Sequence, residues 1–211
     1  MKKLSYLLIL TLVVATALLI PALSGAEKIT ASVNNVPVKA AWSSEGDSAA
    51  TVTTETEDLF EILDLGTKGM QRETFDRAWA GYTRLMEAGK ISNQKLSIVD
   101  FSQPSTKKRL YVIDVKERRL LFNTLVAHGR NSGELMAKRF SNTNESLQSS
   151  LGFYLTAEKY MGKHGLSLRM DGLEKTNSNA RQRAIVVHGA NYVSEQFAKS
   201  RGFIGRSWGC P

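Results

Sequence analysis

Two residues near the end of the sequence are suited to covalent chemistry: the only cysteine, Cys210, and a histidine that precedes it, His188. A free thiol has a pKa of about 8.5, so a neighbouring imidazole is needed to generate thiolate near neutral pH. A thiolate paired with a histidine carries out acyl transfer through a thioester. The residue types alone leave open the alternative of a buried thiol and a core histidine that never meet.

The local sequence around both residues suits the catalytic alternative. His188 ends an apolar run at residues 184–187, and a strand end holds a side chain rigidly at a sheet edge, where a general base is required. Cys210 follows Gly209 in a short turn, which exposes the sulfur and leaves backbone N–H groups free to converge on an oxyanion. The two segments together predict a nucleophile and its base.

The N-terminus has the pattern of a secretory signal peptide. Lys2 and Lys3 precede an apolar run at residues 4–20, then Pro21 and small residues follow, with cleavage expected after Ala26. An uncleaved membrane anchor is the alternative, and it would be the chain's only contact with a membrane. Both alternatives export the remaining residues to the periplasm or the cell surface. In such an oxidising compartment a lone cysteine is buried, paired with another chain or chemically employed.

The charge and the histidine spacing argue against two other classes of function. The formal net charge is +8, but the basic residues are scattered, with denser stretches only at residues 107–109 and 116–119. A nucleic-acid-binding protein would concentrate them on one element with interleaved aromatic residues, whereas a basic surface does suit an anionic cell-wall polymer. The three histidines and the cysteine lack the close spacing of metal motifs, so we expect no metal and no cofactor.

The remaining pattern predicts a tether, two helices and a β-rich domain. Residues 27–52 have the composition of a flexible tether, and residues 53–90 are expected to form a helical segment that packs on the catalytic domain. A capping box at Thr54 starts a first helix that Gly66 ends, and a second helix is expected at residues 72–88. A polar stretch at residues 129–150 predicts a long surface loop. The expected strands are residues 96–101, 109–115, 120–127, 151–157, 166–170 and 184–188.

The end of the sequence resembles the signature of the YkuD-type L,D-transpeptidases. It is similar to the branch of murein L,D-transpeptidase catalytic domain proteins, which carry His-Gly-Ala and then Gly-Arg-Ser-Trp-Gly-Cys-Pro, here residues 188–190 and 205–211. Trp208 stands where the wider family usually has a histidine, and the branch shares this tryptophan. The resemblance covers residues 96–211. It implies a mainly β (α+β) fold, a β-sandwich or barrel-like domain preceded by two short helices.

This resemblance also implies a reaction. Cys210 would attack a peptidoglycan stem peptide at its diaminopimelate–D-alanine bond, release D-alanine and keep the acyl group as a thioester, which an amine or water then resolves. Transpeptidase and carboxypeptidase activities therefore both stay open. By the same resemblance His188 is the general base and the backbone carbonyl of Gly189 orients it. The oxyanion hole would be the backbone N–H groups of Trp208, Gly209 and Cys210.

Further residues are candidates for binding the substrate. Arg206 and Arg130 have the guanidinium geometry that matches a carboxylate. His128 either lines the substrate cleft or holds a loop in place, and His164 either contacts the substrate or anchors its own loop. The full set of substrate-binding candidates is Arg206, Ser207, which would shape the turn, His128, Arg130 and Tyr192.

The end of the catalytic domain departs from the family pattern. The printed sequence stops at Pro211, whereas family members continue with residues that close the sheet behind the cysteine. We therefore expect the catalytic domain at residues 91–211 to be incomplete at its C-terminus. A free carboxylate close to Cys210 would raise the pKa of its thiol. The alternatives to an L,D-transpeptidase are thus an L,D-carboxypeptidase, a non-catalytic cell-wall binding module and an unrelated exported cysteine peptidase.

Overall fold

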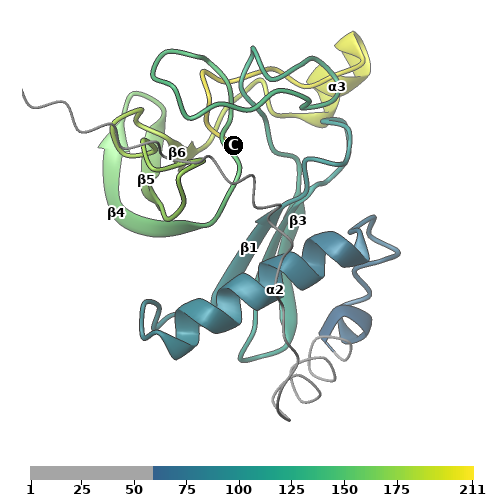
Figure 1. Cartoon of the computed structure of the whole chain (residues 1–211). Helices are drawn as coiled ribbons and strands as arrows, with labels where there is room; N and C mark the ends of the chain where they lie inside the picture. The colour runs from purple at the N-terminus through teal and green to yellow at the C-terminus, as the bar shows by residue number, and fades with distance from the viewer. Residues whose placement is uncertain (1–58) are drawn as a thin grey trace, which may run out of the picture. The chain divides into compact units, whose positions relative to one another are not determined.

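The computed structural model describes residues 59–211, which form a mainly β fold with helices at both ends (Figure 1). The strands make two antiparallel three-stranded sheets, one of β1, β2 and β3 and one of β4, β5 and β6. This architecture confirms the mainly β, α+β fold predicted from the sequence. The elements are α2 (Arg72–Glu87), β1 (Lys95–Val99), β2 (Leu110–Asp114), β3 (Arg119–Thr124), β4 (Tyr154–Gly162), β5 (Gly165–Gly172), β6 (Val186–His188) and α3 (Glu195–Arg201).

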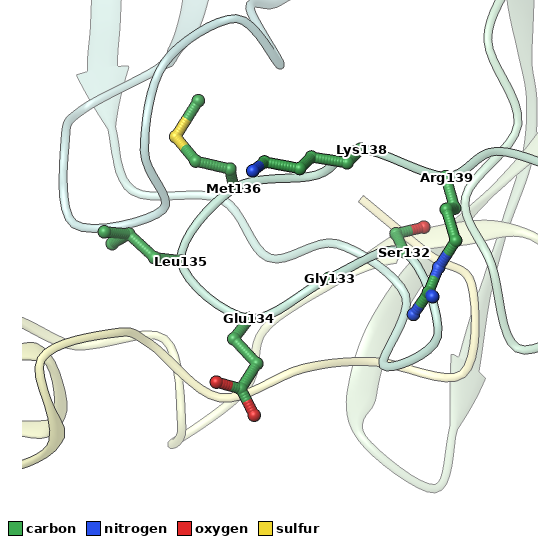
Figure 2. Close-up of a pocket in the computed structure, with 7 residues that line it drawn as sticks. All are labelled: Ser132, Gly133, Glu134, Leu135, Met136, Lys138 and Arg139. Atoms are coloured by element: carbon green, nitrogen blue, oxygen red, sulfur yellow. The ribbon is translucent and has the colours of Figure 1, made fainter.

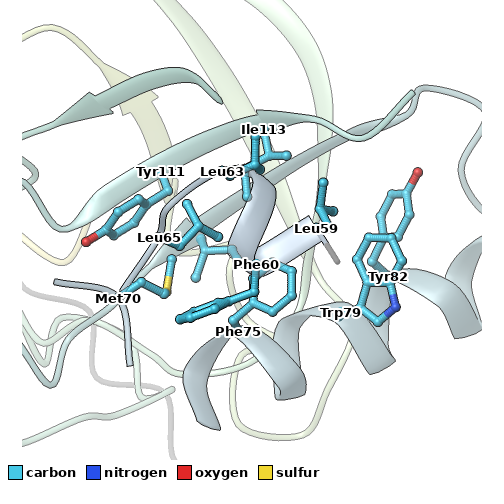
Figure 3. Close-up of a cluster of buried hydrophobic side chains, with 11 residues drawn as sticks. Leu59, Phe60, Leu63, Leu65, Met70, Phe75, Trp79, Tyr82, Tyr111 and Ile113 are labelled. Atoms are coloured by element: carbon cyan, nitrogen blue, oxygen red, sulfur yellow. The ribbon is translucent and has the colours of Figure 1, made fainter. Parts of the chain in front are cut away.

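Helix α2 covers the first sheet with one apolar face. Phe75, Trp79 and Tyr82 recur at helical spacing and are all buried. Tyr111 and Ile113 of β2 are alternate residues of a strand, so they share one face of the sheet, and both are completely buried. The resulting core is shown in Figure 3 and comprises Leu59, Phe60, Leu63, Leu65, Met70, Phe75, Trp79, Tyr82, Ile98, Tyr111 and Ile113.

The helical predictions can be compared with the structure from residue 59 onward. The second predicted helix, residues 72–88, matches α2 to within one residue, and Gly89 follows it with a φ of 62°. Of the first predicted helix, residues 59–62 are helical and residues 63–69 form turns. Its capping residue Thr54, the signal peptide at 1–26 and the tether at 27–52 lie outside the described residues.

The second sheet carries the strand that ends in His188. Strands β4 and β5 form a hairpin whose tip is the turn at residues 163–164. Strand β6 pairs with β5 in the antiparallel direction, and this register places His188 opposite Ser167. A small core lies under this sheet and comprises Met170, Ala180 and Ile185, with Tyr154 packed against it.

Residues 125–153 link the two sheets and contain no strand or helix beyond an isolated bridge at Gly129. This observation confirms the long loop predicted for residues 129–150. The loop is closed by backbone bonds from Asn131 N–H to the Leu147 carbonyl, 3.1 Å, and from Ser141 N–H to the Ser149 carbonyl, 3.0 Å. These bonds give the loop a defined shape without a sheet.

Several elements differ from the sequence prediction. Strand β1 ends at Val99 and not at residue 101, and β3 ends at Thr124 and not at residue 127. Strand β6 begins at Val186 and not at residue 184, and β4 runs to Gly162 and not to residue 157.

Strand β4 was expected to start at residue 151 but starts at Tyr154, because Gly152 has a φ of 128°, a conformation that a strand does not adopt. Helix α3 was not predicted at all, and none of its residues is buried, so it carries no apolar periodicity. Within residues 59–211, no helix has the length and apolar character needed to cross a membrane.

Candidate active site

The turn that carries the cysteine, residues 207–210, is shaped by the hydroxyl of Ser207. This hydroxyl accepts a hydrogen bond from Gly209 N–H, 3.1 Å, and donates one to the Cys210 carbonyl. The backbone of Ser207 is tied to a distant segment, since its N–H donates to the His128 carbonyl, 2.9 Å, and its carbonyl accepts from Arg130 N–H, 2.8 Å. Ser207 is buried, so these bonds fix the cysteine turn from within.

A second serine, which belongs to the long loop and not to the turn itself, also bonds to the cysteine turn. The buried Ser149 hydroxyl donates to the Gly209 carbonyl, 3.1 Å, and accepts from Gly129 N–H, 3.0 Å. The Ser149 N–H in turn donates to the hydroxyl of Ser132, 2.9 Å. Gly209 has a φ of 131°, and a Cβ added to it would lie 3.1 Å from the Gln148 carbonyl oxygen. Glycine is therefore required where the turn packs against this loop.

The thiol of Cys210 is partly buried beside the start of β6. Its Sγ lies 3.8 Å from the Ala184 carbonyl oxygen. Burial raises the pKa of the Cys210 thiol, while the N–H of Val186 and the positive charge of Arg183 act in the opposite direction. Because burial is the largest of these causes, the thiol is protonated at neutral pH and needs a base to become a nucleophile.

His188 stands at the other end of the same short strand. Val186 and His188 are alternate residues of β6, so their side chains share a face, and Cys210 approaches the backbone of Val186. The Nδ1–H of His188 donates to the Gly189 carbonyl, 2.7 Å, which leaves Nε2 as the nitrogen that can accept a proton. In the described part of the chain, the imidazole of His188 and the thiol of Cys210 are not hydrogen-bonded to each other.

The imidazole of His164 stacks on that of His188, with ring centroids 4.7 Å apart and ring planes inclined by 21°. His164 lies at the tip of the β4–β5 hairpin, so this contact joins the hairpin to the end of β6. The sequence left open whether His164 contacts substrate or anchors its loop. Its observed position is beside the candidate base.

Two of the three backbone donors predicted for the oxyanion hole donate to no other described residue, although the Cys210 N–H does stabilise the ionised form of its own thiol. The N–H groups of Trp208 and Cys210 are in this state, whereas the Gly209 N–H donates to the hydroxyl of Ser207, 3.1 Å. The Trp208 side chain is 77% exposed. An oxyanion in this arrangement would therefore be met by the N–H groups of Trp208 and Cys210.

Arg206 precedes the cysteine turn and retains unused donors. Its Nη1 donates to the carbonyls of Arg130, 3.3 Å, and Gly133, 3.2 Å, and its guanidinium lies over the Phe203 ring, 5.4 Å from the centroid. Nε and Nη2 have no acceptor within residues 59–211. The Arg130 side chain is exposed. Both arginines can therefore still offer N–H groups to a carboxylate.

A hollow borders this arginine side of the site (Figure 2). It shares Gly133 with the contact made by Arg206, because the Gly133 carbonyl accepts the bond from Nη1. The lining combines apolar and charged side chains and comprises Ser132, Gly133, Glu134, Leu135, Met136, Lys138 and Arg139. The exposed lining of the hollow is mainly apolar, with charged groups at its edge.

Comparison with protein families identifies the family of the chain. Residues 66–211 match the model of the L,D-transpeptidase catalytic domain. The chain belongs to the L,D-transpeptidase catalytic domain family. This match confirms the resemblance noted in the sequence. Searches among curated proteins and among solved structures return no match.

Two residues at the candidate site of this L,D-transpeptidase domain escaped the sequence prediction. Arg183 and Tyr154 both interact electrostatically with Cys210, as does the predicted Tyr192. Burial raises the pKa of both phenols, so they stay neutral near the thiol. Tyr192 also packs against Gly205, where an added Cβ would lie 2.4 Å from the Tyr192 Cβ. Arg183 lies in a polar stretch and Tyr154 in a predicted strand, and neither position gives a sequence signal of proximity to Cys210.

His128 lies inside the domain instead of in a cleft. It is 1% exposed; its Nδ1 accepts a bond from Nη2 of the buried Arg109, 2.7 Å, and its Nε2–H donates to the Gly133 carbonyl, 3.2 Å. Burial first, and the charge of Arg109 second, lower the pKa of His128 to about 4. Of the two roles left open by the sequence, this environment favours a histidine that holds its loop in place.

This environment predicts a loss of stability in mild acid. His128 has an ordinary pKa of 6.5 when unfolded and about 4 when folded, so the unfolded chain binds the extra proton between these pH values. The free energy of unfolding should therefore fall by up to about 3 kcal/mol as the pH is lowered from about 6.5 to about 4. Urea unfolding across this range measures the slope. His128→Gln should flatten it, and an equally steep slope in the variant would contradict the assignment.

The described residues bring no metal-binding group together. Within residues 59–211, no set of three or more histidine, cysteine, aspartate or glutamate side chains is arranged to hold an ion. His164 and His188 stack on one another, whereas His128 is bonded to Arg109 in the interior.

Proposed function

We propose that this protein is an exported peptidoglycan L,D-transpeptidase that works through a Cys210 thioester, in the periplasm or at the cell surface. The observation that carries the proposal is the placement of the Cys210 turn against the strand whose last residue, His188, is oriented by the Gly189 carbonyl. Membership of the L,D-transpeptidase family supports the reaction class. The proposed substrate is a stem peptide ending in D-alanine.

The first half-reaction uses the thiol and the imidazole. Nε2 of His188 takes the proton of the Cys210 thiol, and the thiolate attacks the carbonyl of the diaminopimelate–D-alanine bond. The N–H groups of Trp208 and Cys210 bind the resulting oxyanion. The tetrahedral intermediate then collapses, the C–N bond breaks, and the imidazolium returns its proton to the D-alanine amine. The acyl group remains on sulfur as a thioester.

In the second half-reaction the Cys210 sulfur is the leaving group, and His188 takes a proton from the acceptor. The side-chain amine of a second stem peptide attacks the thioester while His188 accepts its proton; the C–S bond then breaks, the Cys210 thiolate leaves and the imidazolium returns the proton to it. Attack by water instead gives a shortened stem peptide, which is the carboxypeptidase outcome. Arg206 supports the binding of the donor stem, because its Nε and Nη2 groups are unused and can pair with a carboxylate.

Incubation with disaccharide-tetrapeptide tests the proposal. We expect release of D-alanine together with a cross-linked dimer, both measured by mass spectrometry of the products. Release of D-alanine with only the disaccharide-tripeptide would identify an L,D-carboxypeptidase. No D-alanine, despite binding of the muropeptide, would identify a binding module. Cleavage of ordinary L-L peptide bonds would instead identify an unrelated cysteine peptidase.

A further inference from the structure

Arg183, shortly before β6, donates hydrogen bonds to four acceptors at once. Nη1 donates to the Ser141 carbonyl, 2.8 Å, and to the Ser150 hydroxyl, 3.2 Å. Nη2 donates to the Ser146 hydroxyl, 3.2 Å, and to the Gln148 carbonyl. A guanidinium has four Nη hydrogens, so all of them are engaged within the protein. This side chain is fixed in place and, unlike Arg206, has no Nη donor left for a substrate.

All four acceptors belong to one stretch of chain, residues 141–150, here called the backing loop. The backing loop meets Gly209 at two points: the Ser149 hydroxyl donates to the Gly209 carbonyl, 3.1 Å, and the Gln148 carbonyl oxygen lies 3.1 Å from the place that a Cβ on Gly209 would take. A Cβ on Gly209 would lie 3.2 Å from Nη2 of Arg183. The backing loop therefore supports the residue immediately before the nucleophile, and Arg183 holds the backing loop.

Arg183 also brings a positive charge to the thiol. Its charge favours the ionised form of Cys210, against the effect of burial. Burial lowers the pKa of Arg183 itself, but a guanidinium stays protonated at physiological pH. The other groups that act electrostatically at the sulfur are the phenols of Tyr154 and Tyr192, which are neutral there. Among the described residues, Arg183 is thus the cation that acts on the Cys210 sulfur, whereas Arg206 lies on the substrate side of the turn.

We propose that Arg183 is a positioning residue for Cys210: through the backing loop it fixes the cysteine turn, and it places a permanent positive charge beside the sulfur. The proposal rests on Cys210 being the nucleophile of the proposed function. Arg181 provides a matched control in the same segment. Its guanidinium is half exposed and pairs with Glu158, 2.8 Å, and Asp171, both on the surface of the second sheet.

Alkylation of the single cysteine by iodoacetamide tests the proposal in the 211-residue chain. Its rate as a function of pH gives the pKa of the thiol, and Cys210 is the only thiol that can react. Arg183→Met should raise this pKa and slow alkylation at neutral pH by about tenfold for each unit of pKa. Arg183→Lys should keep the pKa close to that of the parent chain because it keeps the charge. Arg181→Met should leave both quantities unchanged.

Hydrogen exchange separates the positioning effect from the charge effect. Lysine lacks the guanidinium fork, so Arg183→Lys should speed amide exchange in the backing loop while the thiol pKa stays near its original value. If Arg183→Met does not fold, amide exchange in Arg183→Lys tests the positioning role by itself. An unchanged thiol pKa in Arg183→Met, or unchanged exchange in Arg183→Lys, would overturn the proposal. Alkylation requires no turnover, so failure of the parent chain to release D-alanine would contradict the proposed function alone.

Discussion

Cys210→Ala is expected to reduce D-alanine release from disaccharide-tetrapeptide to the background rate, a loss of at least about a thousandfold. The reason is chemical, because the described residues offer no second thiol and the oxyanion donors cannot replace a nucleophile. The thiol makes only a weak contact with the Ala184 carbonyl, 3.8 Å, so the variant should fold normally. Product analysis by mass spectrometry measures the loss.

Cys210→Ser is the matched control for this experiment. It keeps a hydrogen-bonding group of similar shape at the same position, but its hydroxyl ionises far less readily than a thiol, so release of D-alanine should still fall by more than about a hundredfold. Both variants should bind muropeptide as the parent chain does. Substantial D-alanine release by Cys210→Ala would contradict the assignment of the nucleophile.

His188→Ala is expected to lower kcat/KM for D-alanine release by about a hundred- to ten-thousandfold near neutral pH. Burial raises the pKa of the Cys210 thiol, so without a base the thiol stays protonated and the rate follows the small fraction of thiolate. That fraction rises about tenfold per pH unit below the thiol pKa, so the deficit of the variant should shrink as the pH increases. Rates measured across pH test this.

His164→Ala is the comparison variant for His188. It removes the imidazole that stacks on His188 at 4.7 Å but leaves the bond between Nδ1 and the Gly189 carbonyl intact. We therefore expect a change of only a few-fold, in the range of an aromatic contact. Equal losses in the two variants would mean that the stacked pair, and not His188 alone, supplies the base. A His188→Ala variant with undiminished activity at neutral pH would exclude His188 from that role.

The sequence is most informative about elements that bury a regular face. Helix α2 was predicted almost exactly to its ends because Phe75, Trp79 and Tyr82 repeat at helical spacing. Helix α3 buries nothing, so the only signals for it are the capping residue Ser194 and the terminal Gly202. A helix that packs no apolar face against the domain therefore leaves only its end residues as a sequence signal.

The site divides in the same way. Cys210, His188 and Ser207 lie in short motifs that can be read directly from the chain. Arg183 was not predicted, because an arginine in a polar stretch resembles any surface charge, and its partner Gln148 lies 35 positions away. His128 stands in a motif-like run, yet the fold buries it beside Arg109. Local sequence motifs therefore identify the reacting groups, whereas the residues that hold those groups in place are brought there by contacts between distant segments of the chain.

Reaction with a carbapenem gives the most direct test of the central claim that Cys210 is an acylating nucleophile. A thiolate opens the strained lactam ring and retains the whole molecule as an ester of sulfur, so intact-protein mass spectrometry should show one added carbapenem mass. Peptide mapping should place it on Cys210, and Cys210→Ala should show no adduct. An adduct that persists in Cys210→Ala, or that maps to another residue, would contradict the account.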